Sequence, residues 1–230
     1  MKSFLKFSQA IILLLSLISC NTADYKNLTE ASKEIATYCG TQNVLVSNST
    51  GFFTNDETNA YTITVNNVNI PFDYTIRRVA SHCAQLLYNN LSNEQRKDKD
   101  VIRVTINLKG RSETSDFKMA KLKDAETYIK RGHVILGYIK NGDYKSLHDS
   151  LDPKYFTEDG YDSFQRLILE KNKNVFAKID TIVDDGFSFD IINGKPFVQV
   201  YSHTPIDTMT IRYRLLFDLR KSSFAALEIK

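Results

Sequence analysis

The stretch Phe187-Ser-Phe-Asp-Ile-Ile-Asn-Gly-Lys-Pro-Phe-Val-Gln-Val-Tyr-Ser-His203 decides the fold of the C-terminal half of this 230-residue chain. Its central Asn193-Gly194 is the residue pair that favours a two-residue hairpin turn, and β-prone residues flank it on both sides. Outward from this hairpin, a turn at Asp184–Gly186 and further strands are predicted; the predicted strands cover 175–183, 187–191, 197–203, 208–218 and 224–229. The pattern therefore indicates an antiparallel meander of about five strands.

Helices are predicted immediately before these strands. Asp124–Lys140 places apolar residues at helical spacing and ends at Asn141-Gly142, a pair that commonly stops a helix. Asp143 has the side chain of an N-cap for a short helix that reaches Leu151, and Tyr161–Lys171 forms the third helix.

Three helices followed by a meander, with Tyr138-Ile-Lys-Asn-Gly-Asp-Tyr144 at the end of the first helix, resemble the nuclear transport factor two-like superfamily. The resemblance covers about the last half of the chain and rests on element order and a loose motif. It implies three helices packed on a curved antiparallel sheet that encloses a pocket. Some members of the superfamily use this pocket for catalysis, and many use it only for binding or dimerisation.

The candidate pocket residues follow from strand alternation. Phe197, Gln199, Tyr201 and His203 share one face of their strand, and if that face is concave, Tyr201 and His203 are a hydrogen-bond donor and a base at its mouth. Tyr128, on the long helix, completes the candidate set. The alternative is that Tyr201 packs in the fold and His203 is an exposed strand end.

No catalytic residue, metal site or cofactor is predicted. Asp190 and Tyr128 have the residue types of an isomerase base and oxyanion donor, but nothing in their spacing requires those roles. His148 with Asp149 and Asp152 has the residue types of a metal site, yet adjacent helical positions point apart. Phosphate-binding loops, nucleophile elbows and metalloprotease helices do not occur in the sequence.

The first half of the chain predicts a helix ending at Gly40, strands over 44–53 and 60–70, a helix over 72–91 opened by Pro71, and a strand over 101–108. This is an α-β-β-α-β order, with 93–100 as a loop. The polar window Lys109–Asp116 is interpreted as a domain junction, and the alternative is a hairpin loop within one larger domain. The fold class is therefore α+β, with two small domains at 28–109 and 117–230.

The beginning of the sequence has the features of an export signal. Lys2 and Lys6 precede the short apolar run Ala10–Ile18, which is too short to cross a bilayer. The following Leu17-Ile-Ser-Cys20 resembles the lipobox of bacterial lipoproteins, with Ile18 as a mild departure from its pattern. The resemblance implies cleavage of a signal peptide over residues 1–19, lipid attachment to Cys20 and a tether over residues 20–27. The alternative is an ordinary secretory signal in which Cys20 is incidental.

Two further cysteines remain, Cys39 and Cys83, both in apolar helical contexts. Exported compartments are oxidising, so an even remainder favours a disulfide bridge between them. The alternative is a pair of buried free thiols.

Composition limits the classes of function. Lys and Arg number 30 against 27 Asp and Glu, and the two signs are interleaved, so nucleic acid is not expected as a partner. The leading hypothesis is a non-catalytic envelope lipoprotein, held by its lipid anchor at the outer membrane and facing the periplasm, that acts as a binding or scaffolding module. The alternatives are a small-molecule-binding or weakly catalytic cone domain, and an immunity or assembly factor that binds an unidentified protein partner.

Overall fold

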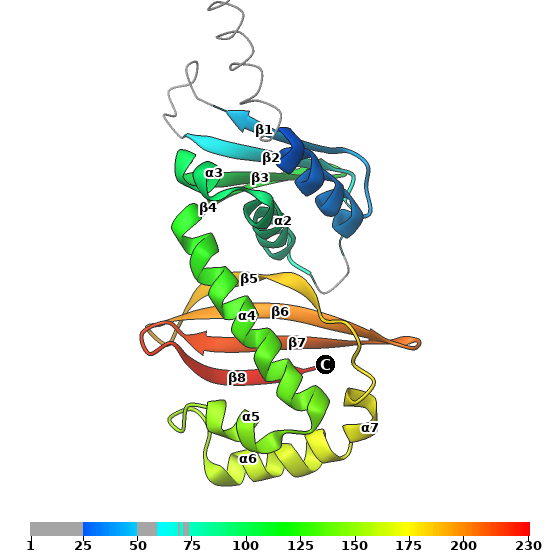
Figure 1. Cartoon of the computed structure of the whole chain (residues 1–230), viewed down its shortest axis with the longest axis vertical. Helices are drawn as coiled ribbons and strands as arrows, with labels where there is room; N and C mark the ends of the chain where they lie inside the picture. Colours follow the sequence, from blue (N-terminus) through cyan, green and yellow to red (C-terminus); the bar gives the residue numbers. More distant parts are fainter. Residues whose placement is uncertain (1–24, 50–58, 69, 71–73) are drawn as a thin grey trace, which may run out of the picture. The chain divides into compact units, whose positions relative to one another are not determined.

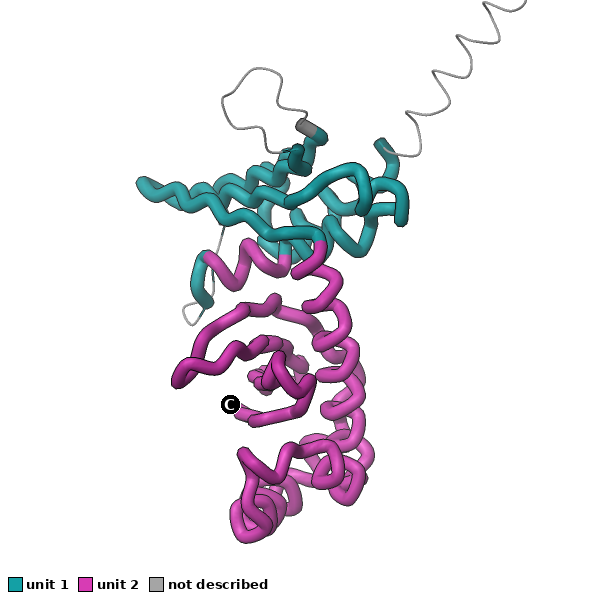
Figure 2. Tube along the Cα trace, turned by 90° about the vertical axis from the view of Figure 1, so that its left-hand side faces the viewer, with its two compact units in different colours: residues 1–76, 83–119 teal, residues 77–82, 120–230 magenta. Residues whose placement is uncertain are grey.

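The computed structural model describes residues 25–49, 59–68, 70 and 74–230 (Figure 1). The chain has a mixed α+β fold with two four-stranded sheets. It divides into two compact units (Figure 2): the first holds the residues up to Ile76 and Cys83–Met119, and the second holds Arg77–His82 and Ala120–Lys230. The predicted signal peptide, the lipobox, residues 20–24 of the tether and residues 50–53 of a predicted strand lie outside the described residues. Residues 25–27, predicted as part of the tether, are already helical.

The first unit contains the sheet β1-β2-β3-β4, formed by β1 (Val44–Ser49), β2 (Ala60–Asn66), β3 (Val101–Leu108) and β4 (Arg111–Lys118). β2 and β3 are parallel, and the two outer pairs are antiparallel. A parallel pair needs a long crossover connection, and α2 (Ile76–Asn90) lies in the segment between β2 and β3.

One face of this sheet is apolar and buried. Alternate residues of β2 and β3 point to this face, because strand side chains alternate with a period of two. A helix over residues 25–39 contributes Ala31 and Ile35, both fully buried, to the same core. The buried strand residues are Tyr61, Ile63, Val65, Ile102, Val104 and Ile106.

The helix predicted over 72–91 starts later, at Ile76, and Pro71 lies outside the described residues. Two other predictions for the first unit are wrong. The window Lys109–Asp116 is not a domain junction, because β4 pairs with β3 along its whole length and Gly110, at φ +79°, lies in the turn between them. The predicted loop at 93–100 contains α3 (Asn93–Asp98). Ser92 caps this helix: its side chain accepts from the Gln95 amide, while the Gln95 side chain accepts from the Ser92 amide.

The second unit begins with helices. They are α4 (Met119–Asn141, in this unit from Ala120), α5 (Tyr144–Ser150), α6 (Glu158–Phe164), the π-helical η1 (Gln165–Glu170) and α7 (Lys173–Phe176). The Asp143 cap is confirmed, since its carboxylate accepts from the Ser146 amide at 3.1 Å. The third helix, predicted over 161–171, corresponds to α6 and η1: it starts earlier, at Glu158, and its second part is a π-helix.

An antiparallel sheet in the order β5-β6-β7-β8 completes the unit, formed by β5 (Val183–Ile192), β6 (Lys195–Ile206), β7 (Met209–Asp218) and β8 (Ser223–Ile229). The hairpin at Asn193-Gly194 is confirmed: both residues have positive φ, +50° and +72°, as a type I′ turn requires.

The strand predicted over 175–183 and the turn predicted at Asp184–Gly186 are wrong. Residues 173–176 are helical, and Asp184–Gly186 lies inside β5, where the pairing with β6 shifts at a β-bulge. Gly186 is not part of a turn; it allows the backbone of β5 to lie close to Arg78 and Ser81. A Cβ atom there would lie 2.5 Å from the carbonyl oxygen of Arg78 and 2.6 Å from the hydroxyl of Ser81.

α4 covers one face of the second sheet. A Cβ on Gly132 would lie 3.7 Å from the Leu215 side chain and 3.8 Å from that of Val200, both fully buried. Phe217 and Phe224 are fully buried as well, so aromatic and aliphatic side chains fill the fold around this face. Of the helices in the described part of the chain, none combines the length and the apolar character needed to cross a membrane.

Candidate functional site

The structure places the candidate residues Tyr201 and His203 on the face of the second sheet that is turned away from α4. Val200 packs toward α4, and its neighbours along β6 point to the opposite side because successive strand side chains alternate. Tyr128 lies elsewhere: its ring centroid is 5.2 Å from that of Phe217, and its hydroxyl is 3.3 Å from the Ser222 hydroxyl. The three residues therefore do not line one pocket.

Tyr201 and His203 belong to a charged group that we call the Asp185 cluster, formed by Arg78, Asp185, Tyr201 and His203 of the second unit. Asp185 is completely buried. One of its carboxylate oxygens accepts from the Arg78 guanidinium at 3.0 Å, and the other lies 2.9 Å from Nδ1 of His203. The guanidinium also stacks 4.4 Å from the centroid of the Tyr201 ring. A buried carboxylate is tolerated here because it has a charged partner and further hydrogen bonds.

Sequence reasoning missed Arg78 and Asp185, since each comes from a segment that the sequence assigned to another role. Arg78 lies in a predicted helix and Asp185 in a predicted turn. The bulge brings Asp185 to Arg78, whose Nε also donates to the Asp185 carbonyl at 3.3 Å. An Asp-Asp-Gly run inside an otherwise apolar strand is the sequence signal that indicates such a bulge.

Two more histidines of the second unit lie near this cluster and experience opposite effects. His133 is 2.7 Å from the Asp184 carboxylate, and this hydrogen bond raises the pKa of its imidazole. His82 is buried, and burial lowers its pKa to about 4, although the charges of Asp184 and Asp185 act in the other direction. At neutral pH His82 is therefore uncharged.

The Asp185 cluster has one element of acid–base catalysis, a carboxylate that orients an imidazole, but its neighbouring hydroxyl is already engaged. The Ser81 hydroxyl donates to the Arg78 carbonyl at 2.8 Å and accepts from the Phe187 amide at 2.9 Å. Asp190 is likewise held: it accepts from the Gln199 side chain at 2.8 Å and from Ser188. These contacts make the cluster a structural support of the sheet edge.

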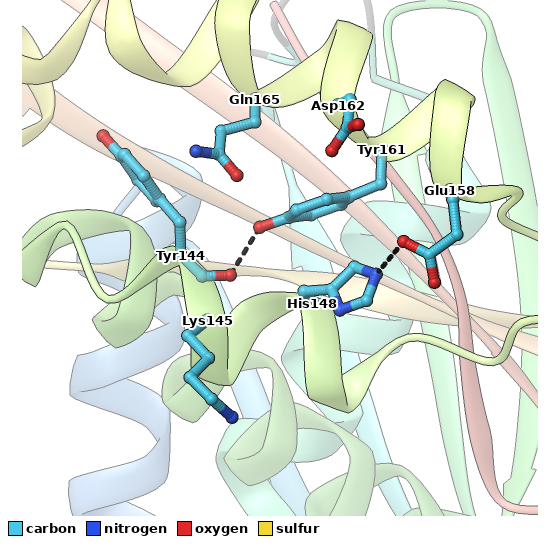
Figure 3. Close-up of a pocket in the computed structure, with 7 residues that line it drawn as sticks. All are labelled: Tyr144, Lys145, His148, Glu158, Tyr161, Asp162 and Gln165. Carbon is cyan, nitrogen blue, oxygen red and sulfur yellow. Dashed lines mark hydrogen bonds and ion pairs between the residues drawn. The ribbon is translucent and has the colours of Figure 1, made fainter.

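A separate open cavity of about 330 Å³ lies between α5 and α6 (Figure 3). Its walls are polar and aromatic. His148 sits 3.1 Å from the Glu158 carboxylate and packs against Tyr161, with the ring centroids 4.5 Å apart. The lining residues are Tyr144, Lys145, His148, Glu158, Tyr161, Asp162 and Gln165.

The tyrosines of this cavity use their hydroxyls within the fold. Tyr161 donates to the Tyr144 carbonyl, as Figure 3 shows, and Tyr144 donates to the Leu169 carbonyl at 3.2 Å. Burial and the surrounding charges raise the pKa of Tyr161 to about 12, so its phenol stays neutral. In the described parts of the chain, no group of three or more His, Cys, Asp or Glu is arranged to hold a metal ion.

The two remaining cysteines do meet. The sulfur atoms of Cys39 and Cys83 are 3.6 Å apart in the core of the first unit, and both residues are present as thiols. The hydrogen bond to Cys39, together with burial, raises the pKa of Cys83. The bridge between them therefore stays a prediction.

Comparison of the chain with models of protein families, with curated proteins and with solved structures gave no significant match.

His82 predicts a pH dependence of stability. The pKa of His82 is lower in the folded chain than in the unfolded chain. Its contribution to the free energy of unfolding is therefore complete above the unfolded-state pKa of about 6.5. As the pH falls toward 4, up to about 3 kcal/mol of this free energy is lost. Urea unfolding of wild type and His82→Gln at pH 7.5 and 4.5 measures this loss, with both pH values chosen to bracket the change. We expect the difference in the free energy of unfolding between the wild type and the variant to shrink as the pH falls.

His133→Gln supplies the control of opposite sign. The pKa of His133 is raised in the folded chain, so its contribution to the free energy of unfolding is present below the pKa of histidine in the unfolded chain. This contribution is lost as the pH rises. The difference between wild type and this variant should therefore grow on acidification. Equal pH profiles for wild type and His82→Gln would contradict a neutral buried imidazole.

Proposed function

We propose that this chain is a bacterial envelope lipoprotein, anchored by lipid on Cys20, whose folded part is a non-catalytic binding or scaffolding module. The observation that carries the proposal is the sequence Leu17-Ile-Ser-Cys20 directly after a basic and then apolar segment. A single acyl chain holds a protein only reversibly, whereas the two or three chains of a lipoprotein cysteine hold it stably.

The non-catalytic part of the proposal is supported by how the polar candidates are used. Asp185 holds Arg78 with one carboxylate oxygen and Nδ1 of His203 with the other, and the neighbouring Ser81 hydroxyl makes two backbone contacts. A nucleophile or base that acts on a substrate needs a free hydrogen-bonding position toward that substrate. The Ser81 hydroxyl has no such position left, and Asp185 and Arg78 use their hydrogen bonds to hold β5.

We also propose that the mature protein consists of two small α+β domains after the tether. The first would be the helix–strand domain, extended to include β4, and the second would be the cone-like domain with helices packed on a curved sheet. The observation in favour is that each four-stranded sheet lies within one compact unit. For location we propose the outer membrane, because Asn21, and not an aspartate, follows Cys20, and its periplasmic face, because the tether has no acidic run.

The lipid anchor is tested by metabolic labelling with a tagged fatty acid in a bacterial host. The full chain should incorporate label and partition into detergent, whereas Cys20→Ser should lose both properties because no sulfur remains to be acylated. Ser19→Thr is not an adequate control because it alters the cleavage site, so Cys39→Ser serves as the matched cysteine change. Labelling of the Cys20→Ser chain would contradict the proposal.

In the oxidising envelope we further expect Cys39 and Cys83 to form a disulfide. By the chain-entropy model a loop of this length would stabilise the fold by about 4 kcal/mol. Protein taken from the envelope and unfolded under alkylating conditions should show neither thiol, and Cys83→Ser should expose the thiol of Cys39. Two reactive thiols in the unfolded wild type would contradict the bridge.

A further inference from the structure

The edges of the two sheets differ in how their outer backbone groups are protected. Unpaired edge groups can pair with another strand, so folded proteins shield them with charges, bulges or covering segments. On β4 the edge carries charge, from Arg111 and Glu113, which form an ion pair at 3.0 Å, and from Asp116 and Lys118.

Both edges of the second sheet are also protected. On β5 the bulge, the Ser81 hydroxyl and the Arg78 guanidinium occupy outer backbone groups. On β8 the Phe224 carbonyl accepts from the backbone amide of Asp152 at 2.9 Å, and Glu228 forms ion pairs with Arg214 and Lys230.

Among the described residues, β1 has no charge, no proline and no bulge, and its outer backbone groups have a single side-chain contact. Its sequence, Val-Leu-Val-Ser-Asn-Ser, contains no charge and no proline. Its pairing with β2 determines which backbone groups face outward. The Asn66 amide donates to the Asn43 carbonyl, so odd-numbered residues of this segment bond to β2, while Val44, Val46 and Asn48 direct their amides and carbonyls away from it. The Val44 carbonyl has one long contact, 3.4 Å to the Ser32 hydroxyl, and keeps a second lone pair.

An apolar side chain accompanies this edge. Leu45 is 63% exposed and lies on the face of the sheet opposite to the buried core. Its row across the sheet continues with Thr64, Thr105 and Thr114, so Leu45 is the apolar member of a polar row.

We propose that β1 pairs with β1 of a second copy of this chain, antiparallel and about a twofold axis at Leu45, so that the two sheets become continuous. In this register Val44 of one protomer faces Val46 of its partner, and both are residues whose backbone groups point outward. Leu45 then faces its own copy as a non-hydrogen-bonded pair, in which side chains approach most closely.

A second copy is the occupant that fits because the edge is self-complementary. A twofold axis applies the same contact twice, and an uncharged strand meets no repulsion from its copy. A charged partner segment would find no opposite charge on β1. The proposal does not depend on the lipid anchor, because only the first unit contributes to the contact.

Site-directed cross-linking tests the register. Full chain carrying Leu45→Cys should form a disulfide-linked dimer on mild oxidation, because the two Cβ atoms would lie about 5 Å apart. Ser47→Cys is the matched control, on the same strand and face, whose partner in this register is Asn43 and not its own copy. We expect at least about a tenfold excess of cross-linked dimer for Leu45→Cys, with the unaltered chain measuring the background from native cysteines.

Sedimentation in detergent provides an independent readout. At about 0.1 mM the wild type should be dimeric, since a micromolar contact is saturated there. Leu45→Lys should be monomeric, because it places like charges opposite each other at an exposed position, and Ile191→Lys, at a site that is 79% exposed, should stay dimeric. A monomeric wild type, or equal cross-linking of the two cysteine variants, would overturn the proposal.

Discussion

The buried carboxylate of Asp185 is the constraint on which the edge of the second sheet depends. A charge in the protein interior is costly unless it is paired, and here a guanidinium and an imidazole share it. The carboxylate reaches them only because β5 bulges at this point, and the bulge requires a glycine next to it. Charge pairing, strand irregularity and residue choice are thus parts of one local arrangement.

This arrangement also changes how the histidines are interpreted. His203 has the residue type and neighbour of a catalytic base, and its Nδ1 lies at a buried carboxylate that Arg78 also contacts. His82 is neutral through burial, and His133 is tied to Asp184. The contacts of His203 and His133 with Asp185 and Asp184 hold parts of the fold together.

Part of this structure could be predicted from the sequence, and the parts that could not have definite causes. Asn193-Gly194 and Asp143 were predictable because turn and cap chemistry is local. The edge strand β4 was missed because a charged edge strand has the composition of a linker. α3 was missed although Ser92 and Gln95 form a capping box that is readable in the sequence.

The candidate site was harder to predict. Strand alternation placed Tyr201 and His203 on one face correctly, but the sequence could not say which face α4 covers. The partners Arg78 and Asp185 are 107 positions apart, and single-sequence patterns carry no information about such long-range pairs. The cavity lies between α5 and α6, which are neighbours in the sequence, but it depends on how these two helices pack against each other.

The account is tested most directly by a double-mutant cycle of Arg78→Met and Asp185→Asn, with the free energy of unfolding measured in urea at pH 7. If the buried pair holds the edge, each single change leaves an uncompensated buried group, and the double variant should be more stable than the sum of the single losses predicts, by at least about 2 kcal/mol. Losses that add to within about 0.5 kcal/mol would show that the two side chains do not depend on each other and would contradict the account.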